Sequence, residues 1–579
     1  MVLTPSSDNF KTLFQSHFTH GTMDPVELHK FLVEVQNEHN VSEAQAKAMM
    51  QEFSKTSGIP SFNLQNFIDF LFDTKYNFAI NTQIHHDMTS TMSHYFIFTG
   101  HNSYLTGNQL SSSSSEKPIV EALRRGVRVV ELDLWPNSNE DDVSVFHGKT
   151  LTSSVSFETC LLAIKENAFL KSDFPVIVTL EDHLPPKLQE KAAKTICETF
   201  GEILYKPKEK DLKEFPSPQE LKRRILISTK PPKIPDDDTI KKTKEMIATN
   251  EIQDGGSFVR KDISSAGYPI KDIGVSTEAF VNKDEGSDED SDPPESRPDT
   301  HVSTDYRRLI SIRAGKPKGV SLVDALKVAA QVKRVSLSEP QLKSVAESNS
   351  TEVVKFTHSN FLRVYPYGLR FDSSNYDPML AWAHGAQMVA LNMQGYGKYL
   401  WIVQGFFRGN GGCGYVRKPP FLQPGSTYVN MFDPENPLPV KLRLKVRILT
   451  GYGWLEFYGK RSFDTLSDPD FYTRVGIAGV DADKIMKRTK TKKNKWIPWW
   501  DEEFEFELRV PELAVLRLEV YEEDQGARDD FAGQICLPVS ELKSGYKVVH
   551  LCNGKGDVME LADGKEAIKL LLKIQISAC

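Results

Sequence analysis

Residues able to do chemistry recur at one kind of position in the first half of this chain, the end of a short apolar segment. The residues at these ends are His101 with Asn102, Glu131 with Asp133, His147, Glu181 and Lys230. Glu131 and Asp133 are two residues apart, so on a strand both carboxylates point to the same face. If the segments form neighbouring parallel strands, we expect all these side chains to converge on one pocket.

The residue types at these ends suit a phosphodiesterase that uses a hard metal ion. Those that supply only oxygen donors are Asn102, Glu131, Asp133 and Glu181. Several carboxylates of variable geometry favour calcium over magnesium. The two imidazoles, His101 and His147, titrate close to neutral pH and can stabilise charge or move protons. A zinc site would instead recruit these histidines as ligands.

Each of these residues taken alone has an ordinary structural explanation. A single carboxylate at a strand end is commonly solvated or ion-paired, and a single histidine is commonly a structural hydrogen bonder. The repetition of such residues at five successive segment ends is the observation that favours a shared pocket.

Apolar segments with helix-length connections predict an irregular (β/α)₈ barrel that is interrupted by a linker. The first five segments are HYFIFTG, VRVVELDLW, VSVFHG, PVIVTLEDH and RRILISTK, and three more follow the linker, FLRVYP, MVALNMQG and YLWIVQGFF. A barrel places its ligand site at the C-terminal ends of the strands. The connection between Asp133 and Val143 is too short for a helix, so we expect the irregularity there.

The rest of the chain falls into regions that differ in hydrophobic periodicity and charge. VELHKFLVEVQ and LQNFIDFLF show helical periodicity, DEGSDEDSDPPESRPD (284–299) is acidic and almost without apolar residues, and the last part alternates like an all-β sandwich. We predict a helical module (1–86), a first barrel half (87–231), an acidic disordered linker (232–315), a second barrel half (316–435) and a sandwich (440–579). The helical module contains no DxDxDG calcium loop, so we expect it to pack against the barrel as structure.

Composition narrows the class further. With 579 residues, 39% of them hydrophobic, and no apolar stretch of about 18 residues, we expect a soluble multidomain protein without a transmembrane segment. The first residues do not resemble a secretory signal. The six cysteines are scattered without a CxxC pair, which suggests neither a disulfide framework nor a zinc site. A net charge of -7 argues against general nucleic-acid binding.

Long motifs in the barrel region resemble a known family. HNSYLTGNQL, VVELDLW, FHGKTLTS, VIVTLEDH, YPYGLRFDSSNYDP and GNGGCGYVRKP look like the paired X and Y catalytic segments of eukaryotic phosphoinositide-specific phospholipase C. The likeness runs from about residue 87 to 579 in the order X, linker, Y and C2-type domain. We expect no room for an N-terminal pleckstrin-homology domain and only part of an EF-hand module, which is similar to the compact plant-type subfamily.

The resemblance implies a fold, a reaction and roles for residues. The fold would be an EF-hand-like module, a split TIM-type barrel and a C2-type sandwich. The reaction would be calcium-dependent hydrolysis of phosphatidylinositol phosphates, with phosphatidylinositol 4,5-bisphosphate as the expected substrate, to an inositol phosphate and diacylglycerol. The family route is attack of the inositol 2-hydroxyl on phosphorus, which gives a cyclic phosphate that water then opens.

The resemblance also implies a role for each matching position. Asn102, Glu131, Asp133 and Glu181 would hold calcium, Glu131 could also take the proton, and His101 and His147 would be the active-site histidines. The residues implied to contact the inositol head group are Lys230, Ser336, Arg363 and Tyr365. Many animal relatives carry a further lysine where this chain has Ser228, so contact with the ring phosphates is expected to be weaker or differently arranged.

The sandwich contains two acidic segments that are candidates for a second calcium site. Their candidate ligands are Asp464, Asp468 and Asp470 in SFDTLSDPDFY, and Glu522, Asp524 and Asp530 in YEEDQGARDDFAG. The second segment has the spacing of a calcium-binding C2 loop, whereas the acids of the first are closely bunched. A solvated acidic turn is the alternative.

The basic segment 484–496, KIMKRTKTKKNKW, adjoins Trp496, Trp499 and Trp500 and suits an anionic membrane surface. Its alternatives are a nuclear-targeting sequence or an exposed hairpin, with the tryptophans in the sandwich core. We expect peripheral binding to phosphoinositide-containing membrane on the cytoplasmic face of the plasma membrane.

Two other functions remain open at this stage. One is a catalytically inactive phosphoinositide-binding adaptor, whose usual sign is loss of a histidine or calcium ligand, and this chain retains all of these residues. The other is a phosphodiesterase with a different substrate, against which Lys230, Ser336 and Arg363 argue because they suit extra ring phosphates.

Overall fold

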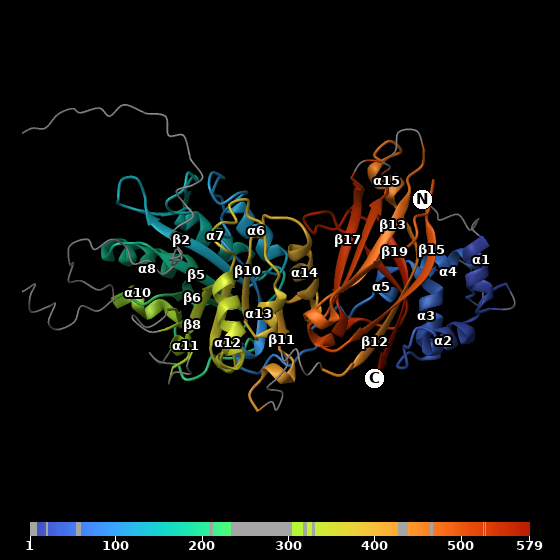
Figure 1. Ribbon diagram of the computed structural model, residues 1–579, viewed down its shortest axis with the longest axis horizontal. Coiled ribbons are helices and arrows are strands. Elements are labelled where there is room, and N and C mark those ends of the chain that lie inside the picture. Colours follow the sequence, from blue (N-terminus) through green and yellow to red (C-terminus); the bar gives the residue numbers. More distant parts are fainter. Residues whose placement is uncertain are drawn as a thin grey trace, which may run out of the picture.

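The computed structural model describes residues 8–579 apart from short gaps and one long one. The residues outside the description are 1–7, 19–20, 54–59, 208–211, 233–303, 316–320, 327–330, 426–437, 464–466, 525 and 527. The acidic stretch 284–299 and Asp464 therefore lie outside the described residues. Figure 1 shows a barrel at one end of the molecule and a sandwich with the N-terminal helices at the other.

Eight parallel strands form the predicted barrel. Their order in the sheet is β7-β6-β5-β2-β1-β10-β9-β8. Because β10 pairs with β1, the sheet read as a ring follows the order of the strands along the chain. A bridge between Ala314 and Arg334 joins the two remaining edges. The strands are β1 (Tyr95–Gly100), β2 (Val129–Pro136), β5 (Val176–Asp182), β6 (Ile225–Thr229), β7 (Ile310–Arg313), β8 (Arg334–Ser338), β9 (Phe361–Tyr365) and β10 (Met388–Leu391).

Helices cover the outside of the barrel, where they bury the apolar residues of its strands (Figure 1). They are α6 (Lys117–Arg124), α7 (Phe157–Asn167), α8 (Pro186–Phe200), α10 (Thr304–Leu309), α11 (Leu322–Ala325), α12 (Glu339–Thr357), α13 (Met379–Ala383) and α14 (Lys398–Phe406). The short strand β11 (Tyr415–Arg417) adds antiparallel to β1. None of the described helices is long and apolar enough to cross a bilayer.

The number of barrel strands was predicted correctly, but two of the segments assigned to them were wrong. VSVFHG contains β3 (Val143–Val145), which forms an antiparallel hairpin with β2 and pairs with β4 (Val155–Ser156) outside the barrel. This hairpin is the irregularity expected after Asp133. YLWIVQGFF is not a strand but helix α14, and the missing barrel strands are β7, which falls inside the segment 232–315 assigned to the linker, and β8.

Helix α14 was mistaken for a strand because it is apolar on nearly every side. It lies between the barrel and the sandwich, where Trp401 stacks on Phe531 with ring centroids 5.4 Å apart. A side chain at Gly405 would collide with Cys536 of the sandwich, so the helix approaches closely there. A continuous apolar segment does not distinguish a buried helix from a buried strand.

The C-terminal region is the predicted all-β sandwich of two antiparallel sheets, in the orders β15-β12-β19-β18 and β14-β13-β16-β17. The first sheet contains β12 (Leu442–Tyr452), β15 (Trp499–Leu508), β18 (Gly545–His550) and β19 (Lys569–Ala578). The second contains β13 (Phe471–Ala478), β14 (Ile485–Arg488), β16 (Val515–Glu522) and β17 (Asp530–Pro538). Inward-facing aliphatic residues of both sheets form a separate core.

The N-terminal helices are α1 (Asp8–Gln15), α2 (Pro25–Glu34), α3 (Glu43–Phe53), α4 (Leu64–Leu71) and α5 (Thr74–Asn77). Helix α2 begins as the sequence suggests, with Asp24 as its N-cap and Pro25 in its first turn. The expectation that this module packs against the barrel is wrong. Its phenylalanines share a core with the sandwich residues Leu449, Tyr546, Val548 and Leu571. The sandwich exposes apolar residues on the outer face of its first sheet, and the helices cover them.

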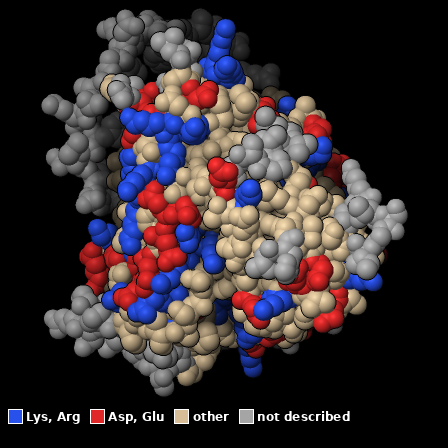
Figure 2. Space-filling view, turned by 90° about the vertical axis from the view of Figure 1, so that its right-hand side faces the viewer, with Lys and Arg blue, Asp and Glu red and all other residues tan. Residues whose placement is uncertain are grey.

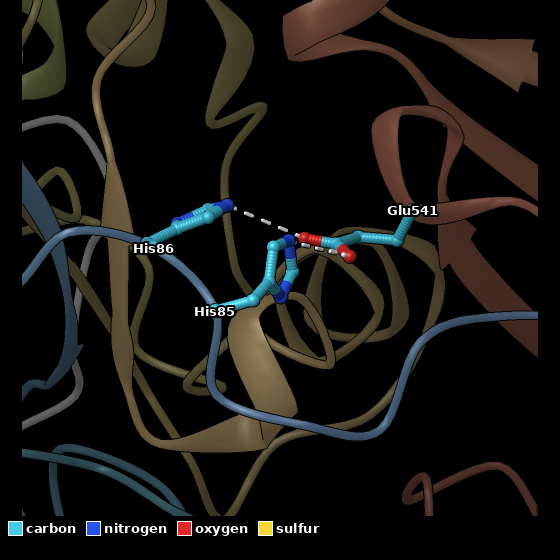
Figure 3. Close-up of side chains that lie close together, drawn as sticks. All are labelled: His85, His86 and Glu541. Carbon is cyan, nitrogen blue, oxygen red and sulfur yellow. Dashed lines mark ion pairs between the residues drawn. The ribbon is translucent and has the colours of Figure 1, made fainter.

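A histidine pair in the connection between the helical module and the barrel bonds to a carboxylate of the sandwich (Figure 3). His85 Nε2 and His86 Nε2 lie 3.4 and 3.5 Å from the buried carboxylate of Glu541. The backbone N–H of Asn410 also donates to this carboxylate. The Arg417 amide donates to His86 Nδ1, so neutral His86 carries its proton on Nε2 and donates it to Glu541. A metal would need the Nε2 lone pair, and the arrangement therefore favours a hydrogen-bonded junction over a metal centre.

We predict that Glu541→Gln lowers the melting temperature, because the junction loses a buried charged acceptor. Burial acts to raise the pKa of Glu541, but the hydrogen bonds from His86 and from the backbone amide of Asn410 hold it below its usual 4.5. A carboxyl with a depressed pKa stabilises the fold above its usual pKa, and this contribution is lost as the pH falls through the depressed value. The difference between wild type and variant in calorimetry should therefore shrink in acid. The exposed Glu34→Gln is the control, and an equal effect of both substitutions at pH 7 would contradict the assignment.

Candidate active site

The barrel strands bring the predicted polar residues to one end of the barrel. In the pairing of β2 with β5, Glu131 lies opposite Thr179 and Asp133 lies opposite Glu181. Opposed residues of parallel strands share a face, so both carboxylate positions of β2 and that of Glu181 face the barrel interior. Asn102, just after β1, has a φ of 40°, a left-handed conformation that is uncommon for a residue with a side chain.

The buried side chain of Tyr104 lies near all three of these carboxylates. The Tyr104 hydroxyl donates to Asp133 Oδ2 at 2.6 Å. Burial raises the pKa of this phenol well above its usual value, and the negative charge of Asp133 raises it further. Glu181 and Glu131 act on the same phenol in the same direction. All three carboxylates therefore lie near the Tyr104 hydroxyl, at the same end of the barrel.

Glu131 is held by both halves of the barrel. Its Oε1 accepts from Arg363 Nη2 of β9 at 2.5 Å, and its Oε2 accepts from the backbone amide of Asn102 at 3.1 Å. The side chains of the ion pair are only 3% and 2% exposed, so water does not screen it. The pair fixes Glu131 relative to both β1 and β9.

The two predicted histidines have the same hydrogen-bonding pattern. His101 Nδ1 bonds to Asn392 Oδ1 at 2.9 Å, and His147 Nδ1 bonds to the Gln109 carbonyl at 2.7 Å. Because both acceptors are carbonyl oxygens, each Nδ1 carries a proton, and this bond fixes the orientation of each ring. His147 reaches the site from the β3 hairpin, not from a barrel strand.

Gln109 connects three of the predicted residues and was missed by the sequence analysis. Its backbone carbonyl accepts from His147, and its Oε1 accepts from Asn102 Nδ2 at 2.9 Å. Its Nε2 donates at 3.1 Å to Asn392 Oδ1, the same oxygen that bonds to His101. The contact with Asn102 uses the amide nitrogen of that residue and leaves its oxygen to bind a cation. Gln109 lies in a loop within HNSYLTGNQL, and no periodic pattern marks it.

Glu181 has a support that sequence reasoning also missed. His183 Nε2 bonds to Glu181 Oε1 at 3.0 Å, and its ring stacks on Trp135 at 4.0 Å between centroids. Gly148, next to His147, lies directly against the indole ring of Trp135, and any side chain at this position would collide with that ring. One tryptophan therefore positions the β3 hairpin and the Glu181 partner together.

The four residues assigned to the head group lie on β6, β8 and β9. Ser336 is paired with Arg363 across β8 and β9, and Lys230 directly follows β6. The ring of Tyr365 is nearly parallel to the ring of His101, with 7° between the ring planes and 6.5 Å between the centroids. The Arg363 guanidinium lies 5.1 Å from the centre of the Tyr365 ring.

Exposed apolar side chains occur on the loops that surround this end of the barrel. They are Leu110, Leu151, Tyr367, Leu369, Phe371 and Tyr396. Backbone hydrogen bonds from Leu151 to Leu110 and from Gln109 to Phe371 join three of these loops. The sequence gives no signal for this apolar rim, since the loops are far apart along the chain. Apolar side chains grouped around the polar residues at the end of a barrel suit contact with a lipid surface.

Among the described residues, the second set of acidic candidates in the sandwich lies close together. Oxygens of Glu522, Asp524 and Asp530 lie within 4.8 Å of one another, as one cation could require. Asp470 has its carboxylate bonded to the Asn494 amide, and Asp468 is bonded to the Trp496 indole. The two described acids of the first segment therefore act within the loop structure.

The tryptophans beside the basic segment belong to the protein interior. Trp500 is buried in the sandwich core, Trp496 packs against that core, and Trp499 contacts Phe10 with ring centroids at 5.0 Å. Seen from the sandwich end, basic and acidic side chains form interleaved bands (Figure 2). In the same domain, arginines and lysines of β12 form ion pairs with acids of β15. The surface is therefore not a single basic field.

Comparison with known proteins first defines the class. Residues 88–231 match the model "Phosphatidylinositol-specific phospholipase C, X domain", residues 309–421 match its Y domain, and residues 443–553 match the C2 domain. The structure has the fold of the crystal structure of L. pealei PLC21, with a TM-score of 0.75 over 99% of this chain and 69% of that one at 23% identity. The chain is thus a phosphodiesterase with a split catalytic barrel and a C2 domain.

The sequence relatives then define the family. Phosphoinositide phospholipase C 2 and 7 of Arabidopsis thaliana are each 48% identical over 98% of this chain and 95% of their own length. The 1-phosphatidylinositol 4,5-bisphosphate phosphodiesterase of Dictyostelium discoideum is 31% identical over 83% of this chain and 59% of its own length. This chain belongs to the phosphoinositide-specific phospholipase C family, whose function is calcium-dependent hydrolysis of phosphoinositides to inositol phosphate and diacylglycerol. The plant-type resemblance is confirmed.

We predict that Arg363→Met destabilises the barrel by about 3–5 kcal/mol, because it leaves the buried Glu131 carboxylate without its guanidinium. The double variant Arg363→Met with Glu131→Gln should lose less than the sum of the single losses. Denaturant unfolding followed by a barrel probe measures this. The exposed pair Arg223–Asp173, treated in the same way, is the control and should show little coupling. Additive losses at Glu131 and Arg363 would contradict the importance of the pair.

Proposed function

We propose that this chain cleaves phosphatidylinositol phosphates, phosphatidylinositol 4,5-bisphosphate among them, at the pocket formed by both barrel halves. The observation that carries the proposal is the convergence of three carboxylates and two Nδ1-anchored histidines on one end of the barrel. Lys230, Ser336 and Arg363 border the same pocket from the other side of the barrel. The Dictyostelium relative, named for the bisphosphorylated lipid, supports the choice of substrate.

Calcium fits the donors that the barrel offers. The candidate ligands Asn102, Glu131, Asp133 and Glu181 present only oxygen atoms, and the nitrogen of Asn102 is occupied by Gln109. Such a set suits a hard cation with flexible coordination. When bound, calcium would act as a Lewis acid that eases deprotonation of the inositol 2-hydroxyl and offsets charge on the phosphate.

The residues of the chain have distinct roles in the proposed reaction. Glu131, fixed by Arg363 and the Asn102 amide, takes the proton of the inositol 2-hydroxyl as it attacks the neighbouring phosphorus. His147 acts as the imidazolium ion: its Nδ1–H stays bonded to the Gln109 carbonyl while its Nε2–H protonates the departing diacylglycerol oxygen, which leaves His147 neutral. His101 donates to the phosphoryl oxygens, where negative charge develops, and Tyr365 stacks on the inositol ring.

Membrane contact involves two surfaces. The apolar rim surrounds the pocket through which a lipid head group would enter, so it would contact the bilayer while the head group reaches the barrel. The Glu522, Asp524 and Asp530 cluster would bridge to anionic lipid through calcium. We infer peripheral association with the cytoplasmic face of the plasma membrane, and the exposed lysines of 484–496 would add electrostatic attraction.

We predict that His101→Ala and His147→Ala each reduce turnover on phosphoinositide vesicles by roughly two to four orders of magnitude. Nδ1 of each imidazole bonds to a neutral carbonyl oxygen, so its removal leaves no unpaired charge on that partner and the barrel should stay folded, which a melting curve checks. His39→Ala, at an exposed position on the helical module, is the control and should keep full activity. Wild-type turnover in either active-site variant would refute the assigned roles.

We predict that Asp524→Asn combined with Asp530→Asn weakens calcium-dependent binding to phosphatidylserine vesicles at least several-fold, since both substitutions remove charge from the cation cluster. Cosedimentation in calcium and in chelator measures the calcium-dependent part. Asp481→Asn, in a fully exposed turn of the same domain, is the control. If the double variant and the control bind alike in calcium, the cluster has no role in membrane binding.

A further inference from the structure

The floor of the barrel contains a second guanidinium that no role above uses. Arg334 is the first residue of β8 and is 6% exposed. It lies two residues before Ser336 on the same strand, so both side chains face the barrel interior. A buried arginine keeps its positive charge, because its pKa is too high to be lowered into the neutral range.

The Arg334 guanidinium extends from β8 across the barrel interior to β5. Its Nη1 donates to Thr179 Oγ1 at 3.1 Å, and both groups are buried. Thr179 pairs with Glu131 of β2 on one side and with Ser228 of β6 on the other. The guanidinium of β8 therefore reaches the level of Glu131 and Ser228, directly below the level of Glu181 and Lys230.

Ser228 leaves a small polar position beside this contact. Its side chain is fully buried, and its hydroxyl has no hydrogen-bond partner among the described residues. Its short side chain leaves room in the barrel interior, and a hydroxyl in that state can accept a bond from a ligand or a water. The level below the pocket thus combines a permanent positive charge with an available polar group.

We propose that Arg334 is a specificity-determining residue. Its guanidinium supplies positive charge to the floor of the pocket and favours lipids whose inositol ring carries phosphates over unphosphorylated phosphatidylinositol. This inference rests on the proposed function. Charge in a poorly screened interior acts over several ångströms, so Arg334 need not touch the ring to discriminate between substrates of different charge.

The test compares Arg334→Gln with wild type on vesicles of phosphatidylinositol and of phosphatidylinositol 4,5-bisphosphate. We expect kcat/KM for the bisphosphorylated lipid to fall on the order of tenfold more than for phosphatidylinositol. Calorimetric binding of inositol 1,4,5-trisphosphate in chelator should weaken similarly, whereas Arg334→Lys should keep most of the preference. The exposed Arg223→Gln is the control and should change neither quantity.

Equal losses on both lipids, or no loss on either, would overturn the inference and leave Arg334 with a structural role. Failure of the wild type to hydrolyse any lipid would instead overturn the proposed function. Ser228→Lys provides a measurement that does not depend on the folding of Arg334→Gln. It adds a cation at the level of Arg334, so it should raise the ratio of kcat/KM for the bisphosphorylated lipid to that for phosphatidylinositol, whereas Ser228→Thr should leave this ratio unchanged. A ratio that Ser228→Lys leaves unchanged would overturn the inference that positive charge at this level selects the substrate.

Discussion

The structure depends on a buried ion pair that crosses the barrel. Glu131 comes from the first half of the chain and Arg363 from the second, 232 positions later, yet their side chains are almost fully enclosed. Neither charge is stable there without the other, so the pair forms only when the two halves close on each other. The same carboxylate accepts from the amide of Asn102. Closure of the barrel and assembly of the site are therefore one event.

This arrangement explains how a long interruption of the barrel is tolerated. The pairing of β1 with β10 and the pairing of β6 with β7 reconnect the halves on both sides of the break. The cost of closing a loop rises only slowly with its length. What the insertion must preserve is the register of β7 and β8, because β8 carries both Ser336 and Arg334 into the interior.

The sequence predicted the barrel and the sandwich, because each depends on local periodicity, and it identified at strand ends residues that the structure brings to one end of the barrel. It misassigned α14 because that helix is buried between two domains, which removes the polar face that marks a surface helix. It placed the N-terminal helices against the wrong domain, since an apolar face does not identify its partner. Gln109, His183 and the apolar rim were missed because their roles arise only from tertiary contacts between distant loops.

Phosphorus NMR of phosphatidylinositol 4,5-bisphosphate vesicles, incubated with the full chain in calcium and in chelator, tests the central claim most directly. The account predicts that a water-soluble inositol phosphate, with some cyclic phosphate, appears together with diacylglycerol only when calcium is present. Unchanged lipid in both samples, or the same products in chelator as in calcium, would contradict a calcium-dependent site built from the two barrel halves.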